Sequence, residues 1–404
     1  MCFSVRLWLH ARRAPVEIEA FQPSGILTLP TIAATNIQSS RFTLEAAYAV
    51  HFLRGAFDDY AWLPDEMVPA RIAVVIDENV AVAHPGLFDR IRRWAARHAP
   101  ALQLIDIRTI AGGEAAKAGW PVIEDLGGWI RDHKLCRHSY LIAIGGGAVL
   151  DAVGFVAATA HRGLRLVRMP TTVLSMNDSG VGVKNGINGF GTKNFWGAFK
   201  VPDLVVCDYD FLPTLDQRTW VSGLAEAFKV GIIKDRDFLD WLCDHVCELR
   251  NREAEAEAHM IERTAQLHMA HICAGGDPFE QGTSRPLDFG HWSAHRLECL
   301  TDFSLLHGEA VAIGVALDLR YAARVRLIEK ADCDRVVGAL RAVGLPTTHT
   351  LLQTDFQAVW QGLDEFREHL GGELSIALPN PLGSVTNLNA LDRSLVEQLA
   401  AEQP

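Results

Sequence analysis

The chain has 404 residues, of which 49% are hydrophobic and 22% are charged, and its formal net charge is −11. This length suggests two domains, each with enough apolar residues for a core. The negative charge argues against a general nucleic-acid binder, because phosphate binding needs a basic surface. The eight cysteines include no Cys-x-x-Cys pair, and neither a signal peptide nor a membrane-spanning run is recognisable. We therefore expect a cytoplasmic protein with reduced thiols.

Three stretches of different character follow one another along the chain. Residues 1–40 predict an irregular N-terminal extension, because they are rich in Pro, Ser, Thr and small residues and have no sustained period. Residues 41–213 alternate between apolar runs, such as RIAVVIDENV and SYLIAIGGG, and stretches with helical spacing. This alternation predicts a parallel sheet covered by helices. Residues 214–404 have a helical period almost throughout and predict a helical domain.

A glycine-rich turn lies between a predicted strand and a predicted helix at Gly145, Gly146 and Gly147. Glycines there let backbone N–H groups approach a pyrophosphate, and the helix N-terminus adds partial positive charge. The spacing is not G-x-G-x-x-G, and a turn of this kind is also typical of a plain strand–helix connection.

Polar residues also follow two other predicted strands. One pair is Asp77 and Asn79. The other is Glu114 and Lys117, in a segment that begins with two glycines. Each pair alone is typical of a surface turn. Together, at the carboxyl ends of successive parallel strands, they predict a ligand crevice.

The segment 169–199 is crowded with Gly, Asn, Thr and Ser. Lys184, Lys193 and Asn194 are candidates for holding a phosphate, because a lysine is a compact and mobile cation. Asp178 is a candidate for bonding a sugar hydroxyl or accepting a proton. The alternative is a solvated loop.

Five residues of the helical half predict a metal site. Glu226 and Lys229 are three apart and His291 and His295 are four apart, so each pair lies on one helix face, and His307 begins another predicted helix. Glu226, His291 and His307 can close around one divalent ion, since imidazole and carboxylate are a normal ligand set for a catalytic zinc. A site using both His291 and His295, as in H-x-x-x-H metalloproteases, has little support, because the full H-E-x-x-H motif is absent.

Six segments carry a resemblance to the 3-dehydroquinate synthase superfamily of sugar-phosphate cyclases. They are GGGAVLD, PTTVLSMNDSGVGVKNGIN, KNFWGAF, LAEAFKVGIIKD, GHWSAH and HGEAVAIG, and they keep their relative spacing over about residues 70–380. The resemblance implies an α/β Rossmann-like N-terminal domain followed by an all-α C-terminal domain, with the site between them. It assigns residues 41–213 to NAD binding and residues 214–404 to metal and substrate binding.

The resemblance also implies roles for single residues. The family's metal ligands, which usually hold zinc or cobalt, match Glu226, His291 and His307. Positions lining the NAD site match Asp77, Asn79, Glu114, Lys117, Gly146, Gly147, Asp151, Thr171, Thr172, Phe211 and Thr214. Substrate-binding and catalytic positions match Asp178, Lys184, Lys193, Asn194, Lys229 and His295. Arg162 matches an arginine that reaches the substrate phosphate of the neighbouring subunit, which implies a homodimer.

The implied activity is that of a carbon–oxygen lyase acting on a seven-carbon sugar phosphate, 3-deoxy-D-arabino-heptulosonate 7-phosphate or a relative. A ring carbinol is oxidised with NAD⁺, phosphate leaves by β-elimination, the hydride returns, and an aldol step closes a carbocycle. A divalent ion polarises the substrate oxygens. The phosphate clamp positions the ring and holds the charge of the leaving group.

The stretch before His291 departs from the family pattern. A family lysine is missing, with Ala270 and His271 nearest to its place; Arg285 is displaced by one position, and Asp288 replaces an asparagine. The family lysine and arginine are associated with the substrate carboxylate, which an acidic Asp288 would repel. A valiolone-synthase-like cyclase of sedoheptulose 7-phosphate, which has no carboxylate, is therefore an alternative.

Near the C-terminus, Arg367 aligns loosely with a cation of the family pattern. Two further kinds of protein remain as alternatives. A metal-dependent alcohol or glycerol dehydrogenase would share the architecture but would need no phosphate clamp. A non-catalytic binding protein on the same scaffold would not need all three metal-ligand positions.

Overall fold

The computed structural model describes residues 2–7, 44–58, 62, 69–99, 101–274, 279 and 286–402. Seven strands form one sheet in the order β1-β2-β9-β6-β5-β3-β4. Their bounds are β1 Cys2–Leu7, β2 Leu44–Leu53, β3 Ala70–Asp77, β4 Leu102–Ile110, β5 Tyr140–Gly145, β6 Arg165–Pro170 and β9 Leu204–Asp208. All neighbouring pairs are parallel except β1 with β2. The predicted parallel sheet is confirmed.

Alternate residues of the central strands face two different cores. In β3, Ile72, Val74 and Ile76 enter one apolar core, while Ala73 and Val75 enter the other. This follows from the period of two along a strand, and it explains why a strand covered on both faces has a continuous apolar sequence.

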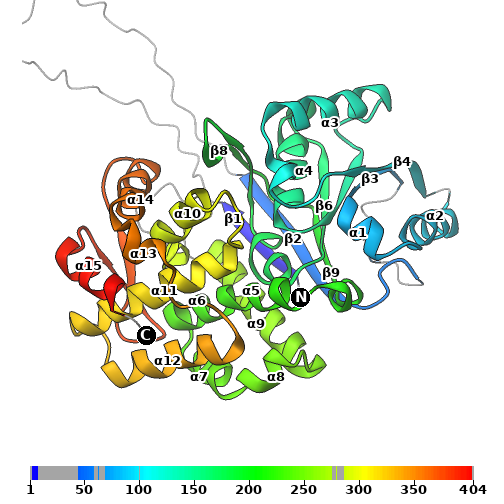
Figure 1. Cartoon of the computed structure of the whole chain (residues 1–404). Helices are drawn as coiled ribbons and strands as arrows, with labels where there is room; N and C mark the ends of the chain where they lie inside the picture. The colour runs from blue at the N-terminus through cyan, green and yellow to red at the C-terminus, as the bar shows by residue number, and fades with distance from the viewer. Residues whose placement is uncertain are drawn as a thin grey trace, which may run out of the picture.

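Helices cover both faces of the sheet (Figure 1). On the second core lie α3 (Trp120–Asp132) and α4 (Gly147–Thr159). The first core includes α2 (Leu87–Arg97) and continues into the helical half of the chain, so this face of the sheet packs against that half. The remaining element beside the sheet is the short helix α1 (Glu78–Ala83).

The second half of the chain is mainly helical, as expected. Its helices are α5 Gln217–Ser222, α6 Leu224–Lys234, α7 Arg236–Asp244, α8 Val246–Arg250, α9 Ala254–Ala274, α10 His291–Leu300, α11 His307–Arg324, α12 Lys330–Val343, α13 Leu351–Thr354, α14 Phe356–His369 and α15 Arg393–Ala401. It differs from an all-α domain in one respect, because β10 (Ile376–Pro379) and β11 (Val385–Leu388) form an antiparallel pair. No helix in the described ranges is both long and apolar enough to cross a membrane.

Two segments outside the large sheet carry expected site residues. The hairpin of β7 (Lys184–Gly189) and β8 (Thr192–Phe199) projects between α4 and α10 (Figure 1). The π-helical turn η4 (Ser175–Ser179) follows β6. Short 3₁₀ turns follow other elements: η2 Gly113–Lys117, η3 Ala160–Arg162, η5 Tyr209–Thr214 and η6 Pro286–Asp288.

The N-terminal stretch differs from the irregular extension that its composition predicts. Cys2–Leu7 form β1 and pair with Leu44–Ala49 of β2, so the backbone groups along the outer side of this part of β2 find partners. The alternating sequence CFSVRL suits an edge strand, a signal too short to outweigh the composition of its surroundings. Residues 8–40 lie outside the described residues.

Candidate active site

The first turns of three helices bring together Glu226, His291 and His307. Glu226 lies in the first turn of α6, His291 begins α10 and His307 begins α11. Nε2 of His291 lies 3.7 Å and Nε2 of His307 lies 3.6 Å from Oε1 of Glu226. This oxygen is buried and accepts no hydrogen bond from the described residues. A buried, unsatisfied carboxylate oxygen facing two imidazoles fits a divalent ion.

Hydrogen bonds from the other ring nitrogens orient both imidazoles. Nδ1 of His291 donates to the carbonyl oxygen of Phe289 at 3.0 Å. Nδ1 of His307 donates to Oε2 of Glu298 at 3.0 Å. In each ring this leaves Nε2 for a metal, which is how metal-binding histidines are usually held.

The charges around the two imidazoles differ. Burial lowers the pKa of His291 to about 4, and the neighbouring Lys229 adds to this effect, so the ring is neutral. Burial also opposes the charge of His307, but the Glu298 carboxylate outweighs it and raises the pKa to about 9. His307 must therefore release a proton from Nε2 when it binds a cation.

A second possible ligand group consists of His295, Glu298 and His307. Within this group, Nδ1 of His307 already donates to Glu298 and is not free for a metal. Burial holds the pKa of His295 well below its ordinary value, so this ring is a neutral hydrogen-bonding group beside the cluster. The group Glu226, His291 and His307 is the better metal site on these grounds.

A buried lysine and a partly buried aspartate lie next to the metal group. Lys229 forms an ion pair with Oε2 of Glu226, and its Nζ lies 3.9 Å from Oδ1 of Asp178. His268, on α9, donates from Nδ1 to the same Asp178 oxygen at 2.8 Å. Burial raises the pKa of the Asp178 carboxyl, but Lys229 and His268 outweigh it, and the pKa lies well below its ordinary value. Asp178 is therefore an ionised acceptor beside a charged lysine.

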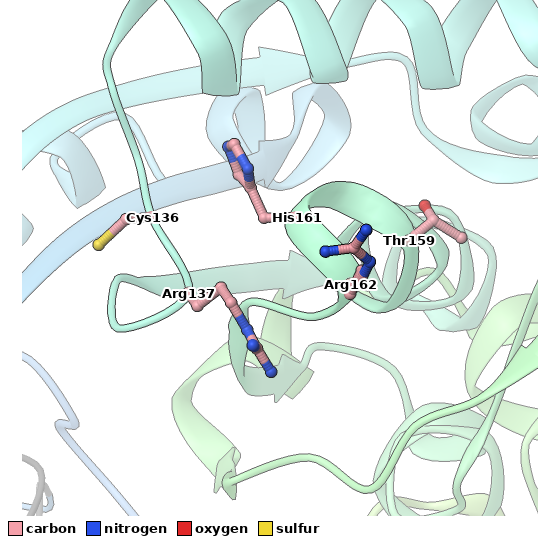
Figure 2. Close-up of a pocket in the computed structure, with 5 residues that line it drawn as sticks. All are labelled: Cys136, Arg137, Thr159, His161 and Arg162. Carbon is pink, nitrogen blue, oxygen red and sulfur yellow. The ribbon is translucent and has the colours of Figure 1, made fainter.

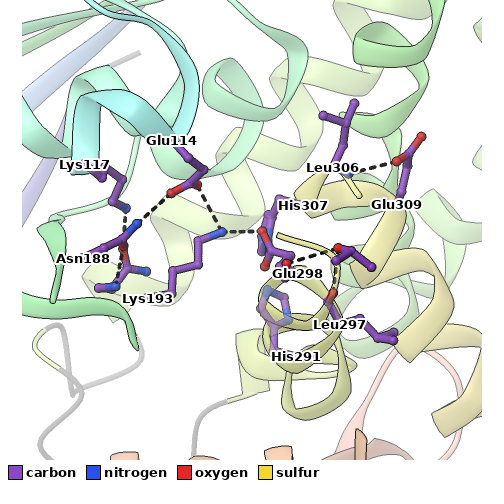
Figure 3. Close-up of polar contacts among 12 residues, drawn as sticks. Glu114, Lys117, Asn188, Lys193, His291, Leu297, Glu298, Leu306, His307 and Glu309 are labelled. Atoms are coloured by element: carbon purple, nitrogen blue, oxygen red, sulfur yellow. Dashed lines mark hydrogen bonds and ion pairs between the residues drawn. The ribbon is translucent and has the colours of Figure 1, made fainter. Parts of the chain in front are cut away.

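Lys193 joins the hairpin to both halves of the molecule (Figure 3). Its Nζ forms an ion pair with Oε1 of Glu298 and lies 3.5 Å from Glu114 in η2. Because the other oxygen of Glu298 accepts from His307, a chain of charged groups runs from Glu114 to the metal group. Asn188 donates a hydrogen bond to Glu114 at 3.0 Å and so helps to hold this carboxylate beside Lys193.

The expected NAD residues all follow parallel strands of the sheet. Asp77 and Asn79 follow β3, Glu114 and Lys117 follow β4, Gly146, Gly147 and Asp151 follow β5, Thr171 and Thr172 follow β6, and Phe211 and Thr214 follow β9. The carboxyl ends of neighbouring parallel strands meet at one edge, so the structure brings these residues together.

Two features of this edge bear on ligand binding. A Cβ on Gly112 would lie 2.2 Å from Oδ1 of Asp77 and 2.3 Å from Nδ2 of Asn79. The Thr171 hydroxyl is buried without a hydrogen-bond partner among the described residues. The missing side chain of Gly112 lets Asp77 and Asn79 lie against the backbone. A buried hydroxyl without a partner fits a polar ligand such as a dinucleotide better than a closed turn.

Two family models match adjacent stretches of this chain, and together they span the site. The 3-dehydroquinate synthase N-terminal model matches residues 107–222, and the 3-dehydroquinate synthase C-terminal model matches residues 223–365. A 3-dehydroquinate synthase of Ruegeria pomeroyi is 35% identical over 331 residues, which are 81% of this chain and 87% of the relative. The chain belongs to the 3-dehydroquinate synthase family.

Solved structures agree with this membership. The 2-epi-5-epi-valiolone synthase ValA of Streptomyces hygroscopicus subsp. jinggangensis, with NAD⁺ and Zn²⁺ bound, aligns with a TM-score of 0.80 and 28% identity, over 88% of this chain and 96% of that one. A 2-deoxy-scyllo-inosose synthase complexed with carbaglucose-6-phosphate, NAD⁺ and Co²⁺ aligns with a TM-score of 0.73 and 20% identity, over 88% and 97%. The second likeness shows the fold alone.

Within this family member, Lys184 and Asp288 interact. Burial raises the pKa of Asp288, but the positive charges of Lys184 and Lys229 outweigh it, so the pKa lies below its ordinary value. Lys184 thus faces an internal carboxylate in addition to any substrate. Asn194 is also engaged, because its side-chain oxygen accepts from Lys117, which pairs with Asp151 at 2.7 Å.

Two expected residues of the described chain, Arg162 and Arg367, are not brought to the metal group. Arg162 lies in η3, beyond the far end of α4 from the glycine turn, where it lines a cavity of about 470 Å³ with Arg137 and His161 (Figure 2). Arg367 is exposed and pairs with Asp364 on its own helix at 2.9 Å. Arg285 lies outside the described residues.

Sequence reasoning missed two residues of this site. Glu298 is three residues after His295 and seven after His291, so its place on the same helix face was a usable signal. The comparison with the family pattern pointed to Ala270 and His271 on α9, whereas His268 is the α9 side chain that reaches Asp178. An alignment counted backwards from His291 passes through residues 275–285 and does not fix the register of α9.

Proposed function

We propose that this family member is a lyase of the 3-dehydroquinate synthase type, which converts a seven-carbon sugar phosphate into a carbocycle with loss of phosphate. We take 3-deoxy-D-arabino-heptulosonate 7-phosphate or a relative as the substrate, and NAD and one zinc or cobalt ion as cofactors. One observation carries the proposal. The chain Glu114–Lys193–Glu298–His307 connects the sheet edge expected to bind NAD with the buried metal group.

Glu226, His291 and His307 would hold the ion, and the residues after the parallel strands would hold NAD. When bound, these cofactors supply Lewis acidity at the substrate oxygens and a reversible hydride acceptor. The relatives with NAD⁺ and Zn²⁺ or Co²⁺ bound support this assignment.

The protein's own groups would handle the proton and the phosphate. Asp178 is an ionised acceptor beside Lys229, so it suits a hydrogen bond from a substrate hydroxyl. Lys193 and the neutral ring of His295 suit the leaving phosphate, as a cation and a donor held by α10. Lys193 is shared between Glu298 and Glu114, and a phosphate dianion would compete for it.

Phosphate release tests this proposal. The purified protein is incubated with NAD⁺, Zn²⁺ or Co²⁺ and each of the two seven-carbon sugar phosphates. We expect release of phosphate without net NADH, and loss of activity after chelation that returns with the ion. Failure with both sugars would contradict the proposal, and net NADH with simple alcohols would support the dehydrogenase instead.

Sedoheptulose 7-phosphate is the second candidate substrate, and Asp288 favours it. This carboxylate faces Lys184 and the metal group, where it would repel a substrate carboxylate but accept hydrogen bonds from hydroxyls. The likeness to ValA at 28% identity supports the same reading. A kcat/KM for the carboxylated sugar above that for sedoheptulose 7-phosphate would rule this candidate out.

We also propose a homodimer in which Arg162 serves the neighbouring subunit. Arg162 and Arg137 make no ion pair with the described residues. Arg162 lies at the opposite end of α4 from the glycine turn, so it suits a site on another copy better than its own. The division of the protein into an NAD-binding domain (residues 41–213) and a metal- and substrate-binding domain (residues 214–404) is also part of this proposal.

A further inference from the structure

The loop from Asp178 to Lys184 has a candidate substrate residue at each end. It runs from the end of η4 to the start of β7, so most of its carbonyl groups lie outside any helix or ladder. Buried carbonyl groups need donors, and in a glycine-containing loop of this kind they must come from elsewhere. The source of these donors decides how firmly Asp178 and Lys184 are held.

A single buried guanidinium supplies most of them. Arg168 lies on β6 and is 0% exposed. Its Nη1 donates to the carbonyl oxygens of Ser179 at 3.2 Å, Gly180 at 3.2 Å and Gly182 at 2.8 Å, and its Nη2 donates to that of Lys184 at 2.9 Å and to the side chain of Asn185. None of these acceptors is a carboxylate.

The carbonyl groups that Arg168 does not reach have other donors. The Tyr48 hydroxyl donates to Val181 at 2.8 Å, and the amide of Lys200 donates to Val183 at 2.9 Å. The carbonyl of Asp178 accepts from the amides of Val181 and Gly182 at 3.2 Å each. Every carbonyl from Asp178 to Lys184 is therefore satisfied in this conformation of the loop.

The loop is also packed tightly against the helix that follows the glycine turn. A Cβ on Gly154 of α4 would lie 1.7 Å from Oδ1 of Asn185, and one on Gly147 would lie 2.7 Å from Oγ of Ser179. An isolated buried charge is costly, and here hydrogen bonds to neutral groups and the charge of Asp151 offset that cost. A smaller apolar side chain would avoid the cost but leave four carbonyl groups without donors.

We propose that Arg168 is a positioning residue, whose guanidinium sets the separation of Asp178 and Lys184 and thereby the binding of the sugar phosphate. The effect on substrate rests on the proposed function. The effect on the loop does not.

Arg168→Lys tests the proposal, because lysine keeps the charge but cannot span carbonyl groups on both sides of the loop. The matched control is Arg165→Lys on the same strand, where the guanidinium lies over the Tyr140 ring instead of the loop. We expect amides 178–185 to exchange hydrogen faster in Arg168→Lys alone. We further expect KM for the sugar phosphate to rise about tenfold or more while kcat changes less, since a misplaced Lys184 weakens binding.

Tyr48→Phe provides a milder second variant if Arg168→Lys does not fold. It removes one loop donor and should shift exchange and KM in the same direction by a smaller factor. Faster exchange with unchanged KM, at a temperature well below the melting point, would overturn the positioning role. Unchanged exchange would show that Arg168 does not hold the loop. A wild-type protein inactive on both sugars would contradict the proposed function and leave the exchange result standing.

Discussion

Glu298 divides its two carboxylate oxygens between a candidate phosphate cation and a candidate metal ligand. Oε1 pairs with Lys193 and Oε2 accepts from Nδ1 of His307. Burial opposes its charge, but His307 and Lys193 outweigh this and hold its pKa well below the ordinary value. One carboxylate thus orients the imidazole and links metal binding to phosphate binding.

Substituting Glu298 should weaken metal binding more than it weakens the fold. In Glu298→Gln an amide nitrogen replaces one of the two acceptors, so either Lys193 or His307 loses its partner. We expect the affinity for Zn²⁺ to fall about tenfold or more, measured by competition with a chelating dye. The control is Glu365→Gln on α14. It removes an exposed partner of Arg296, which lies on α10 like Glu298. Equal affinities for both variants would contradict the role.

Asp318 makes stability depend on pH near neutrality. It accepts from the amide of Gly290 at 3.2 Å and from Nε1 of Trp292 at 3.0 Å, on either side of His291. Burial raises its pKa to about 7, above the unfolded value, despite these two hydrogen bonds. Its contribution to stability is therefore fully present below about pH 4 and is lost as the pH rises through about 7.

Urea unfolding of the wild type and Asp318→Asn at several pH values measures this contribution. The difference in unfolding free energy between wild type and variant should fall by about 3 kcal/mol from pH 4.5 to pH 8. The variant has one acceptor oxygen fewer and loses one of the two bonds at every pH. The change of the difference with pH, and not its size at one pH, therefore reports the titration of Asp318. A constant difference would mean that Asp318 does not titrate in this range.

At the scale of elements, glycines of α11 let its backbone lie close to the start of α10 and to the end of α5, which precedes α6. A Cβ on Gly314 would lie 2.0 Å from the carbonyl oxygen of Gly290, and one on Gly308 would lie 1.8 Å from that of Ser222. Gly290 itself has φ of +78° at the start of α10, and a Cβ there would lie 2.8 Å from the amide nitrogen of Val315. These contacts fix where His291 and His307 meet.

Gly314→Ala should separate α10 and α11. We expect it to lower the free energy of unfolding by about 2 kcal/mol, as overpacking does in other cores, and to weaken metal binding. Gly338→Ala in α12 is the matched control, since nothing lies within 4 Å of its Cβ position. That control should be neutral or stabilising by up to about 1 kcal/mol. Thermal unfolding with and without Zn²⁺ measures both effects.

Elements whose signal is local could be predicted from the sequence. The apolar runs of β3 and β5 and the helical period after residue 214 were enough, because burial on two faces or one stripe leaves a periodic pattern. The hairpin of β10 and β11 was not predicted, since two four-residue strands leave little pattern. Nothing in the apolar run RLVRMP predicts a role for Arg168, because that role depends on a loop that follows later in the chain.

Glu226, His291 and His307 could be predicted, because the family pattern groups them although they lie on three helices. Pairings between distant segments that this pattern does not group could not be predicted. Lys193 and Glu298 are 105 residues apart, and only the folded chain brings the hairpin next to α10. The same holds for His268 and Asp178, which are 90 residues apart.

At the scale of the whole molecule, the proposed homodimer makes a distinct prediction. Arg162→Ala and His291→Ala should each abolish most activity, for different reasons and in different subunits' sites. A mixed dimer has one site with both defects and one with neither. Random mixing should therefore restore about a quarter of the wild-type activity.

The two variants are co-expressed with different tags, and activity is measured in the mixture. Mixing His291→Ala with Glu226→Gln is the control, because both changes affect the same site and no intact site can form. Recovery in that control, or none in the first mixture, would contradict a shared site.

The strand order has a consequence for how the chain is made. Between β2 and β6 lies β9, whose residues come 151 positions or more after those of β2 (Leu53 and Leu204). Until Asp208 has left the ribosome, β2 and β6 both present unpaired edges, and non-local pairing of this kind is slow and exposed to aggregation. Chain termination or strong pausing before this point should therefore yield fragments that depend on chaperones, whereas pausing after it should be harmless to the sheet.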